Sequence, residues 1–155
     1  MPHHATKVAK KAIFVRCSDG DWGPGTAEIV DDLLGLNAGE RDDVSVAGTV
    51  PEIARNKKYG QFLAADLRLL ARNHRIAILV LVHHSGCAKL AFLRGGPFPT
   101  EEEDHAHGLE VLKAAAKVLR DACRELTWSV AIRALYVHDE NHDGVIESDE
   151  IAIVI

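Results

Sequence analysis

Cysteine, histidine and aspartate side chains that could bind a metal ion stand at two places in this sequence. The first is Cys17-Ser-Asp19-Gly-Asp21, and the second is His84-Ser-Gly-Cys87. Two thiolates and one imidazole are donors that zinc prefers, and Asp19 could supply a fourth ligand. The two residues between His84 and Cys87 let both side chains turn onto one ion. We therefore predict a zinc site formed by Cys17, His84 and Cys87, with Asp19 as a candidate fourth ligand.

The competing interpretation is that both cysteines are buried free thiols and that His84 is an ordinary hydrogen-bonded histidine, since free cysteine is among the most buried residue types. We favour zinc because both motifs follow strand-like segments and carry polar residues that a packed interior would not tolerate. The chain has three cysteines, far apart in the sequence, which argues against a disulfide framework. Zinc binding requires thiolates, so the affinity should fall at low pH.

The elements that position these motifs can be predicted from apolar patterns. Residues 76–82 form the clearest strand, and their unbroken apolarity indicates burial on both faces. Strands alternating with helices predict right-handed βαβ units, so we expect a single α/β domain over residues 1–155 with a mostly parallel central sheet flanked by helices and a last strand that could be antiparallel. Loops at the carboxyl ends of neighbouring strands would then meet. The expected strands are 12–17, 44–47, 76–82, 128–137 and 145–155, and the expected helices are 26–34, 59–73 and 107–126.

The composition excludes several classes of partner. Apolar residues make up 47% of the 155 residues and charged residues 26%, as in an ordinary globular domain. The net charge of -5 disfavours nucleic acid and anionic membranes, which both reward basic patches. We find no apolar run long enough to span a bilayer and no secretory signal in residues 1–12. We therefore expect a cytoplasmic protein without a nucleic-acid or membrane partner.

The two metal-binding motifs resemble those of the β-class carbonic anhydrases, which carry Cys-x-Asp-x-Arg after the first strand and His-x-x-Cys after a later one. The segment from Ala47 to Thr49 is similar to the family's Ala-Gly-Asn, and the strand carrying Tyr136 resembles a closing strand of the family. The resemblance covers most of residues 12–155, although the chain is shorter than usual members. It implies a carbonate dehydratase, a lyase in which zinc-bound hydroxide reversibly hydrates CO₂ to bicarbonate. It also implies a switchable zinc ligand at Asp19 and a homodimer or a larger homo-oligomer built from dimers.

Position 21 departs from the family pattern, because Asp21 stands where the family has arginine. That arginine pairs with the aspartate and draws it off the zinc, which frees a site for water. Arg16 should not replace it, since it precedes Cys17 on an alternating strand and should point to the opposite face. A unit charge at ~7 Å in an effective dielectric of ~20 contributes roughly 2.4 kcal/mol, and the exchange changes two units. A zinc-bound water would then be harder to deprotonate.

Three interpretations of Asp21 stay open. Asp19 could remain on zinc and close the site. Another cation could replace the arginine, and the candidates are Arg55, Lys57, Lys58 and Lys89. Alternatively, Asp21 could be protonated or act as a base for a bound water, in which case Asp19 and Asp21 would both be catalytic.

A second motif in residues 139–150 matches the spacing of an EF-hand calcium loop, with glycine at its sixth position. The flanking segments are rich in β-branched residues, which favour strands rather than the helices of an EF-hand. A hairpin turn made of turn-forming residues is therefore the competing interpretation. The predicted calcium ligands are Asp139, Asn141, Asp143, Val145 through its carbonyl, and Glu150.

Three functional hypotheses follow. The first is a zinc enzyme that hydrates CO₂, with Asp19 gating the open position or orienting the nucleophile. The second is a zinc-binding relative that has lost this activity because of Asp21. The third is a calcium-responsive module that uses residues 139–150.

Overall fold

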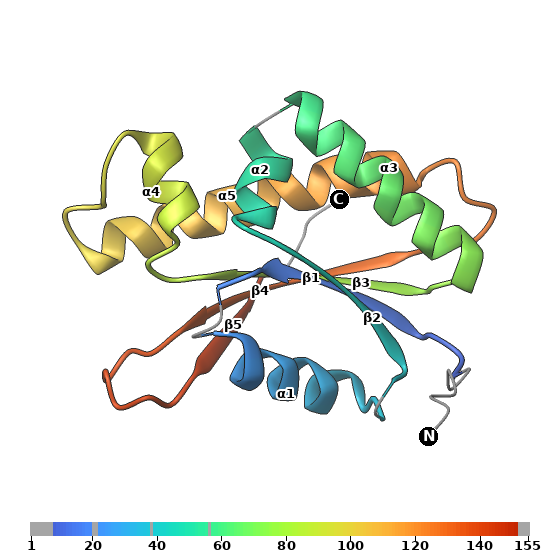
Figure 1. Ribbon diagram of the computed structural model, residues 1–155, viewed down its shortest axis with the longest axis horizontal. Coiled ribbons are helices and arrows are strands. Elements are labelled where there is room, and N and C mark those ends of the chain that lie inside the picture. The colour runs from blue at the N-terminus through green and yellow to red at the C-terminus, as the bar shows by residue number, and fades with distance from the viewer. Residues whose placement is uncertain (1–7, 20–21, 38, 56, 152–155) are drawn as a thin grey trace, which may run out of the picture.

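The computed structural model describes residues 8–19, 22–37, 39–55 and 57–151, which form one α/β domain (Figure 1). Its sheet has the strand order β2-β1-β3-β4-β5. The first four strands are parallel to their neighbours, and β5 runs antiparallel to β4. The predicted fold class is confirmed, including the antiparallel last strand. The strands are β1 (Ala12–Cys17), β2 (Arg41–Val46), β3 (Ile78–His84), β4 (Ala131–His138) and β5 (Glu147–Ile151).

Helices cover both faces of the sheet. One face carries α1 (Gly23–Leu34), whereas α2 (Thr49–Arg55), α3 (Lys57–His74) and α5 (Glu101–Cys123) cover the other (Figure 1). The short helix α4 (Ala88–Arg94) follows β3 directly beyond the carboxyl edge of the sheet. Among the described residues, no helix combines the length and the apolar character that a membrane crossing needs.

The alternation of side chains along β1 determines where the last residues of this strand point. Ile13 and Val15 are fully buried against α2, α3 and α5, whereas Phe14 is fully buried on the α1 face. Continuing the alternation places Arg16 on the α1 face and Cys17 on the other. Burial on both faces also explains the unbroken apolar runs Ala12–Val15 in β1 and Ile78–Val82 in β3.

Two short helices escaped prediction, and the three predicted helices α1, α3 and α5 all begin earlier than predicted. Helices α2 and α4 have seven residues each, which is too short for a clear helical period. Helix α1 begins at Gly23, three residues before the predicted start, so Thr26 lies inside it. The Thr26 hydroxyl donates to the Trp22 carbonyl at 2.5 Å.

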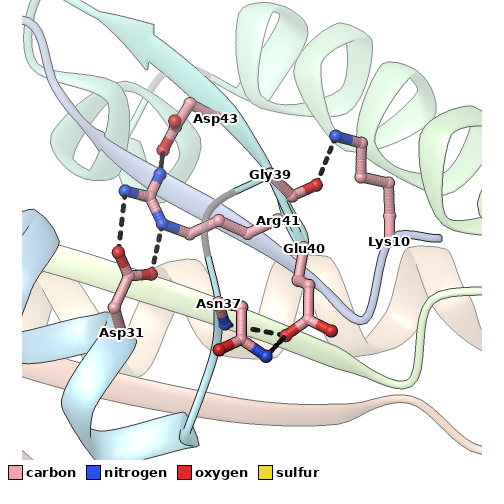
Figure 2. A network of polar contacts seen from close by, with 7 residues as sticks. All are labelled: Lys10, Asp31, Asn37, Gly39, Glu40, Arg41 and Asp43. Atoms are coloured by element: carbon pink, nitrogen blue, oxygen red, sulfur yellow. Dashed lines mark hydrogen bonds and ion pairs between the residues drawn. The ribbon is translucent and has the colours of Figure 1, made fainter. Parts of the chain in front are cut away.

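Strand β2 begins at Arg41, three residues before the predicted start, because its charged residues lie at the edge of the sheet and find partners there. Arg41 lies between Asp31 of α1 and Asp43 of its own strand, with 2.6 Å between Arg41 Nε and Asp31 Oδ1 (Figure 2). Its guanidinium lies 5.3 Å from the centroid of the Phe14 ring. Nearby, Lys10 donates to the Gly39 carbonyl at 2.6 Å. These contacts connect α1, β1 and β2 at the end of the sheet opposite the metal-binding motifs.

We predict that Arg41→Ala lowers the free energy of unfolding by about 1–3 kcal/mol, because it leaves two carboxylates without their shared cation and removes a largely buried side chain. The matched control is Arg72→Ala at an exposed position of α3, which should change stability by less than about 0.5 kcal/mol. Urea unfolding followed by circular dichroism measures both. Equal stabilities of the two variants would contradict this role of Arg41.

Candidate metal centre

The structure brings together the three residues predicted to bind zinc. Cys17 ends β1, His84 ends the neighbouring parallel strand β3, and Cys87 follows one turn later. One potential ligand atom from each of them lies within 4.8 Å of the other two. The prediction that these distant loops meet at the carboxyl edge of the sheet is therefore correct, and the three side chains form the candidate metal centre.

The imidazole of His84 is oriented as in a metal ligand. Its Nδ1 lies 2.9 Å from the Ser85 carbonyl, which can only accept, so Nδ1 carries the hydrogen. Its Nε2 is buried and makes no hydrogen bond. Metal-ligating histidines characteristically donate their second ring nitrogen to a carbonyl or carboxylate. The ring also stacks on Trp22, with 5.5 Å between the ring centroids. The lone pair of Nε2 therefore has no partner in the protein, and a bound cation would satisfy it.

The sulfur of Cys17 accepts hydrogen bonds from backbone amides. Gly48 N lies 3.2 Å from Cys17 Sγ, and the Asp19 amide also donates to it. Gly48 has a φ of +64°, and a Cβ at this position would lie 2.1 Å from Lys89 Cγ, so only glycine fits. The next residue, Thr49, donates its hydroxyl to the Arg16 carbonyl at 2.6 Å. The segment between Ala47 and Thr49 thus supports the end of β1.

The two thiols share one proton in the metal-free protein. A hydrogen bond from the Cys87 thiol outweighs the cost of burial and lowers the pKa of Cys17 to about 3. Sharing its proton with Cys17, together with burial, raises the pKa of Cys87 even though the amides of Lys89 and Leu90 donate to its sulfur. Burial disfavours a charged His84, but its contacts with the Cys17 sulfur and the Ser85 carbonyl prevail and raise the pKa of His84.

The predicted fourth ligand and catalytic residues are less defined. The carboxylate of Asp19 does not belong to the group of ligand atoms within 4.8 Å, although its charge contributes to the raised pKa of His84. Its carbonyl accepts from Trp22 N at 3.3 Å. Asp21 lies outside the described residues. The roles of Asp19 and Asp21 therefore remain predictions.

The cations considered as replacements for the family arginine have other surroundings. Lys89 Nζ lies 2.5 Å from the buried carboxylate of Glu52. Arg55 and Lys58 are exposed, and the side chain of Lys57 lies outside the described ones.

Arg16 lies on the Phe14 face, as expected, with its guanidinium 5.5 Å from that ring. It nevertheless borders a cavity of about 10 Å³, room for one water, whose walls also include Cys17 and His84.

His83 packs in the core and is not solvated. It is 1% exposed, and its ring lies 5.9 Å from that of Tyr136. Burial lowers the pKa of His83 to about 3, so it stays neutral. His83 therefore has a packing role in the core.

The predicted calcium loop is a β-hairpin flanked by β4 and β5 rather than by helices. Asp139 accepts from the amides of Asp143 at 3.1 Å and Gly144 at 2.9 Å, which closes the turn. Glu150, the twelfth loop position, makes a bidentate pair with Arg133 at 2.6 and 2.7 Å. Since its intended bidentate ligand is engaged elsewhere, the calcium interpretation gains no support, and the turn interpretation agrees with the structure.

Sequence reasoning missed one residue that contacts the candidate metal centre. Asp104 of α5 accepts a hydrogen bond from the amide of Gly86, inside the turn that joins His84 to Cys87. It ends the acidic run of residues 101–104, and it is 9% exposed although the three glutamates before it are exposed. No local pattern in the sequence marks Asp104 as different from its acidic neighbours.

Comparisons with known proteins identify the fold. No family model matches the chain, and no curated protein is similar to it in sequence. Among solved structures it resembles one of two tetrameric β-carbonic anhydrases from the ascomycete Sordaria macrospora, with a TM-score of 0.63 and 14% identity over 93% of this chain and 83% of that one.

Two further β-carbonic anhydrases are similar. The enzyme of the fungal pathogen Aspergillus fumigatus has a TM-score of 0.52 and 16% identity, over 91% of this chain and 76% of that one. Isoform I of the protozoan Trichomonas vaginalis has a TM-score of 0.53 and 14% identity, over 94% and 87%. The resemblance to the β-class carbonic anhydrases is thereby confirmed for the fold.

We predict that zinc affinity rises with pH. Near neutrality the metal-free thiol pair holds one proton because the pKa of Cys87 is raised, and zinc binding must release it. The apparent affinity should then rise about tenfold per pH unit, and more steeply at the acid end, where His84 with its raised pKa must also lose a proton. Competition with a chromophoric chelator between about pH 6 and pH 8 measures this. A constant affinity over that range would contradict the shared proton.

Proposed function

We propose that this protein is a zinc-dependent carbonate dehydratase that interconverts CO₂ and bicarbonate. The observation that carries the proposal is the convergence of Cys17, His84 and Cys87 within 4.8 Å, with an unsatisfied His84 Nε2, in a chain folded like solved β-carbonic anhydrases. The donor set fits zinc, since two thiolates and a neutral imidazole make up three of its usual four ligands.

A bound zinc ion would supply Lewis acidity and lower the pKa of a water nucleophile. The chain itself would contribute the rest. Cys17 and Cys87 would hold the metal as thiolates, and their sulfurs accept hydrogen bonds from backbone amides. His84 is held in one orientation by the Ser85 carbonyl and the Trp22 ring. A three-residue ligand set leaves the fourth position for substrate chemistry or for Asp19.

Asp19 and Asp21 are the proposed catalytic residues. Asp19 follows Cys17 by two residues, and its charge helps to raise the pKa of His84, which supports a role in orienting the nucleophile or closing the fourth position. Asp21, which stands where the family has arginine, could instead act as a base that takes a proton from a bound water. In both cases the carboxylates would add negative charge near a bound zinc ion, which would raise the pKa of a zinc-bound water and leave less hydroxide at neutral pH.

A second candidate function is zinc binding without hydration. Its support is the ion pair between Lys89 and Glu52, because a lysine already neutralised by a buried carboxylate is poorly placed to stand in for the missing arginine. Such a protein would bind zinc as tightly as the enzyme and would serve as a structural, sensing or metal-handling protein.

We further propose a homo-oligomer in the cytoplasm, a homodimer or larger. The related Sordaria macrospora enzymes are tetrameric, and Phe62 and Leu69 are 66% and 55% exposed on α3, which supplies apolar surface for self-association. All three cysteines are free, and thiolate ligands persist in a reducing compartment.

We predict that the purified protein carries about one zinc per chain and that Cys17→Ser and Cys87→Ser each lower zinc affinity at least about tenfold, since a hydroxyl is a poor zinc ligand. Cys123→Ser is the matched control, because Cys123 packs against the core of α5 and should leave the zinc content unchanged. Mass spectrometry of the metal content and chelator competition measure both. Unchanged zinc in the Cys17 and Cys87 variants would remove the proposed site.

We predict that the zinc-loaded protein accelerates CO₂ hydration at alkaline pH in a stopped-flow assay. The negative charge of Asp19 and Asp21 would raise the pKa of a zinc-bound water, so the hydroxide nucleophile would form mainly at alkaline pH. The Cys17→Ser variant is the inactive reference. A zinc-loaded protein with no rate above that of the buffer would exclude the enzyme and leave the second candidate function.

A further inference from the structure

A buried carboxylate of α5 lies against the turn that carries two of the candidate zinc ligands. Asp104 is 9% exposed, and its Oδ2 accepts a hydrogen bond from Gly86 N at 2.7 Å. The hydroxyl of Tyr136 on β4 lies 3.4 Å from the same oxygen. Because a buried carboxylate is costly unless it is well bonded, this placement indicates a specific role for Asp104.

A close approach between α5 and the sheet brings Asp104 to this turn. Gly108 follows Asp104 by one helical turn, and a Cβ there would lie 2.5 Å from Tyr136 Cε2 and 3.0 Å from His83 Cδ2. Only glycine allows the helix to lie so near β3 and β4. At its start, Thr100 accepts from Glu103 N at 3.2 Å and fixes where the helix begins. The first turn of α5 therefore extends over the end of β3.

The amide that Asp104 holds belongs to the peptide group between Ser85 and Gly86. The carbonyl of this same planar group accepts the hydrogen of His84 Nδ1, at 2.9 Å. One peptide thus connects Asp104 to His84, with its N–H directed at the carboxylate and its C=O at the imidazole. Ser85 N additionally donates to the Val137 carbonyl at 3.0 Å, which anchors the other side of the turn.

We propose that Asp104 is a positioning residue for the zinc ligand His84, acting through the Ser85–Gly86 peptide as a carboxylate–peptide–imidazole chain. The carboxylate fixes the plane of the peptide, the peptide fixes the ring of His84 with its hydrogen on Nδ1, and Nε2 is left facing Cys17 and Cys87. Hydrogen bonds in such a chain polarise one another, so the charge of Asp104 also makes Nε2 a stronger donor to a metal. In metalloproteins a carboxylate usually contacts the ligating histidine directly. This inference rests on the proposed zinc site.

The test compares Asp104→Ala, Asp104→Asn and the control Glu102→Ala, which removes an exposed carboxylate from the same helical turn. Loss of an outer partner of a metal-ligating histidine costs about 10–100-fold in metal affinity, so we expect that loss of zinc affinity in Asp104→Ala. Asparagine can still accept from Gly86 without the charge, so Asp104→Asn should recover part of the affinity. Glu102→Ala should bind zinc like the parent protein.

The second readout is the tautomer of His84 in the metal-free protein, observed by ¹⁵N NMR at alkaline pH, where the imidazole is neutral. The parent and Glu102→Ala should show hydrogen on Nδ1 alone, and Asp104→Ala should show a mixture of both tautomers. A purely structural role would lower the melting temperature without moving the tautomer. If Asp104→Ala does not fold, Asp104→Asn carries the test, with a smaller loss of affinity and the same direction.

The outcomes separate the two proposals. A parent protein that binds no zinc would remove the proposed function, while the tautomer would still show whether Asp104 orients His84. A parent with normal zinc affinity, together with a folded Asp104→Ala variant that keeps the Nδ1 hydrogen and binds zinc within about threefold of the parent, would overturn the role of Asp104 alone.

Discussion

The structure depends on two neighbouring parallel strands that end at the same edge of the sheet. Two sulfurs and one imidazole nitrogen meet there, and they carry too few hydrogens to satisfy each other by hydrogen bonds. Cys17 closes β1, and His84 closes β3 with Cys87 in the following turn. The two sulfurs share one proton, and the nearby Nε2 of His84 is buried without a hydrogen-bond partner. Such a convergence of lone pairs is unfavourable in a protein interior unless a cation occupies it. The surrounding elements supply amides, a carbonyl and a carboxylate that hold the donors in place.

The charge of the candidate metal centre separates binding from reactivity. Two thiolates cancel the charge of a zinc ion, so the three ligands suffice for binding whatever stands at position 21. Reactivity in the β-class carbonic anhydrases depends on the arginine that draws the aspartate off the zinc, and this sequence has Asp21 where that family has the arginine. Because different residues govern the two properties, a chain with this fold can keep the metal and lose the hydration reaction. Arg16 borders the small cavity whose walls also include Cys17 and His84.

Local patterns in the sequence predict the frame of the candidate metal centre but not its supports. The apolar runs that became β1 and β3 are long enough to identify as buried strands, and adjacency of parallel strands then brings Cys17 to His84 and Cys87. Asp104 could not be recognised, since its neighbours in the acidic run are exposed and its burial depends on the close approach at Gly108. The contact between Gly86 and Asp104 joins residues on different elements, and such a long-range contact leaves no signal in the local periodicity of the sequence.

The same limit explains the calcium motif. Its spacing fits an EF-hand, but the strands on either side turn it into a hairpin whose Glu150 pairs with Arg133 across β4 and β5. Residues that favour tight turns and residues that bind calcium are largely the same, namely aspartate, asparagine and glycine. The tertiary context of the segment therefore decides between the two, and the β-branched flanks were the informative part of the sequence.

The account stands on two sulfurs and one imidazole nitrogen surrounding one ion. X-ray absorption at the zinc edge of the loaded protein measures that arrangement directly. It should show two sulfur neighbours at ~2.3 Å, one nitrogen at ~2.0–2.1 Å and one further light atom. A zinc environment without sulfur, or with only one sulfur per ion, would contradict the account.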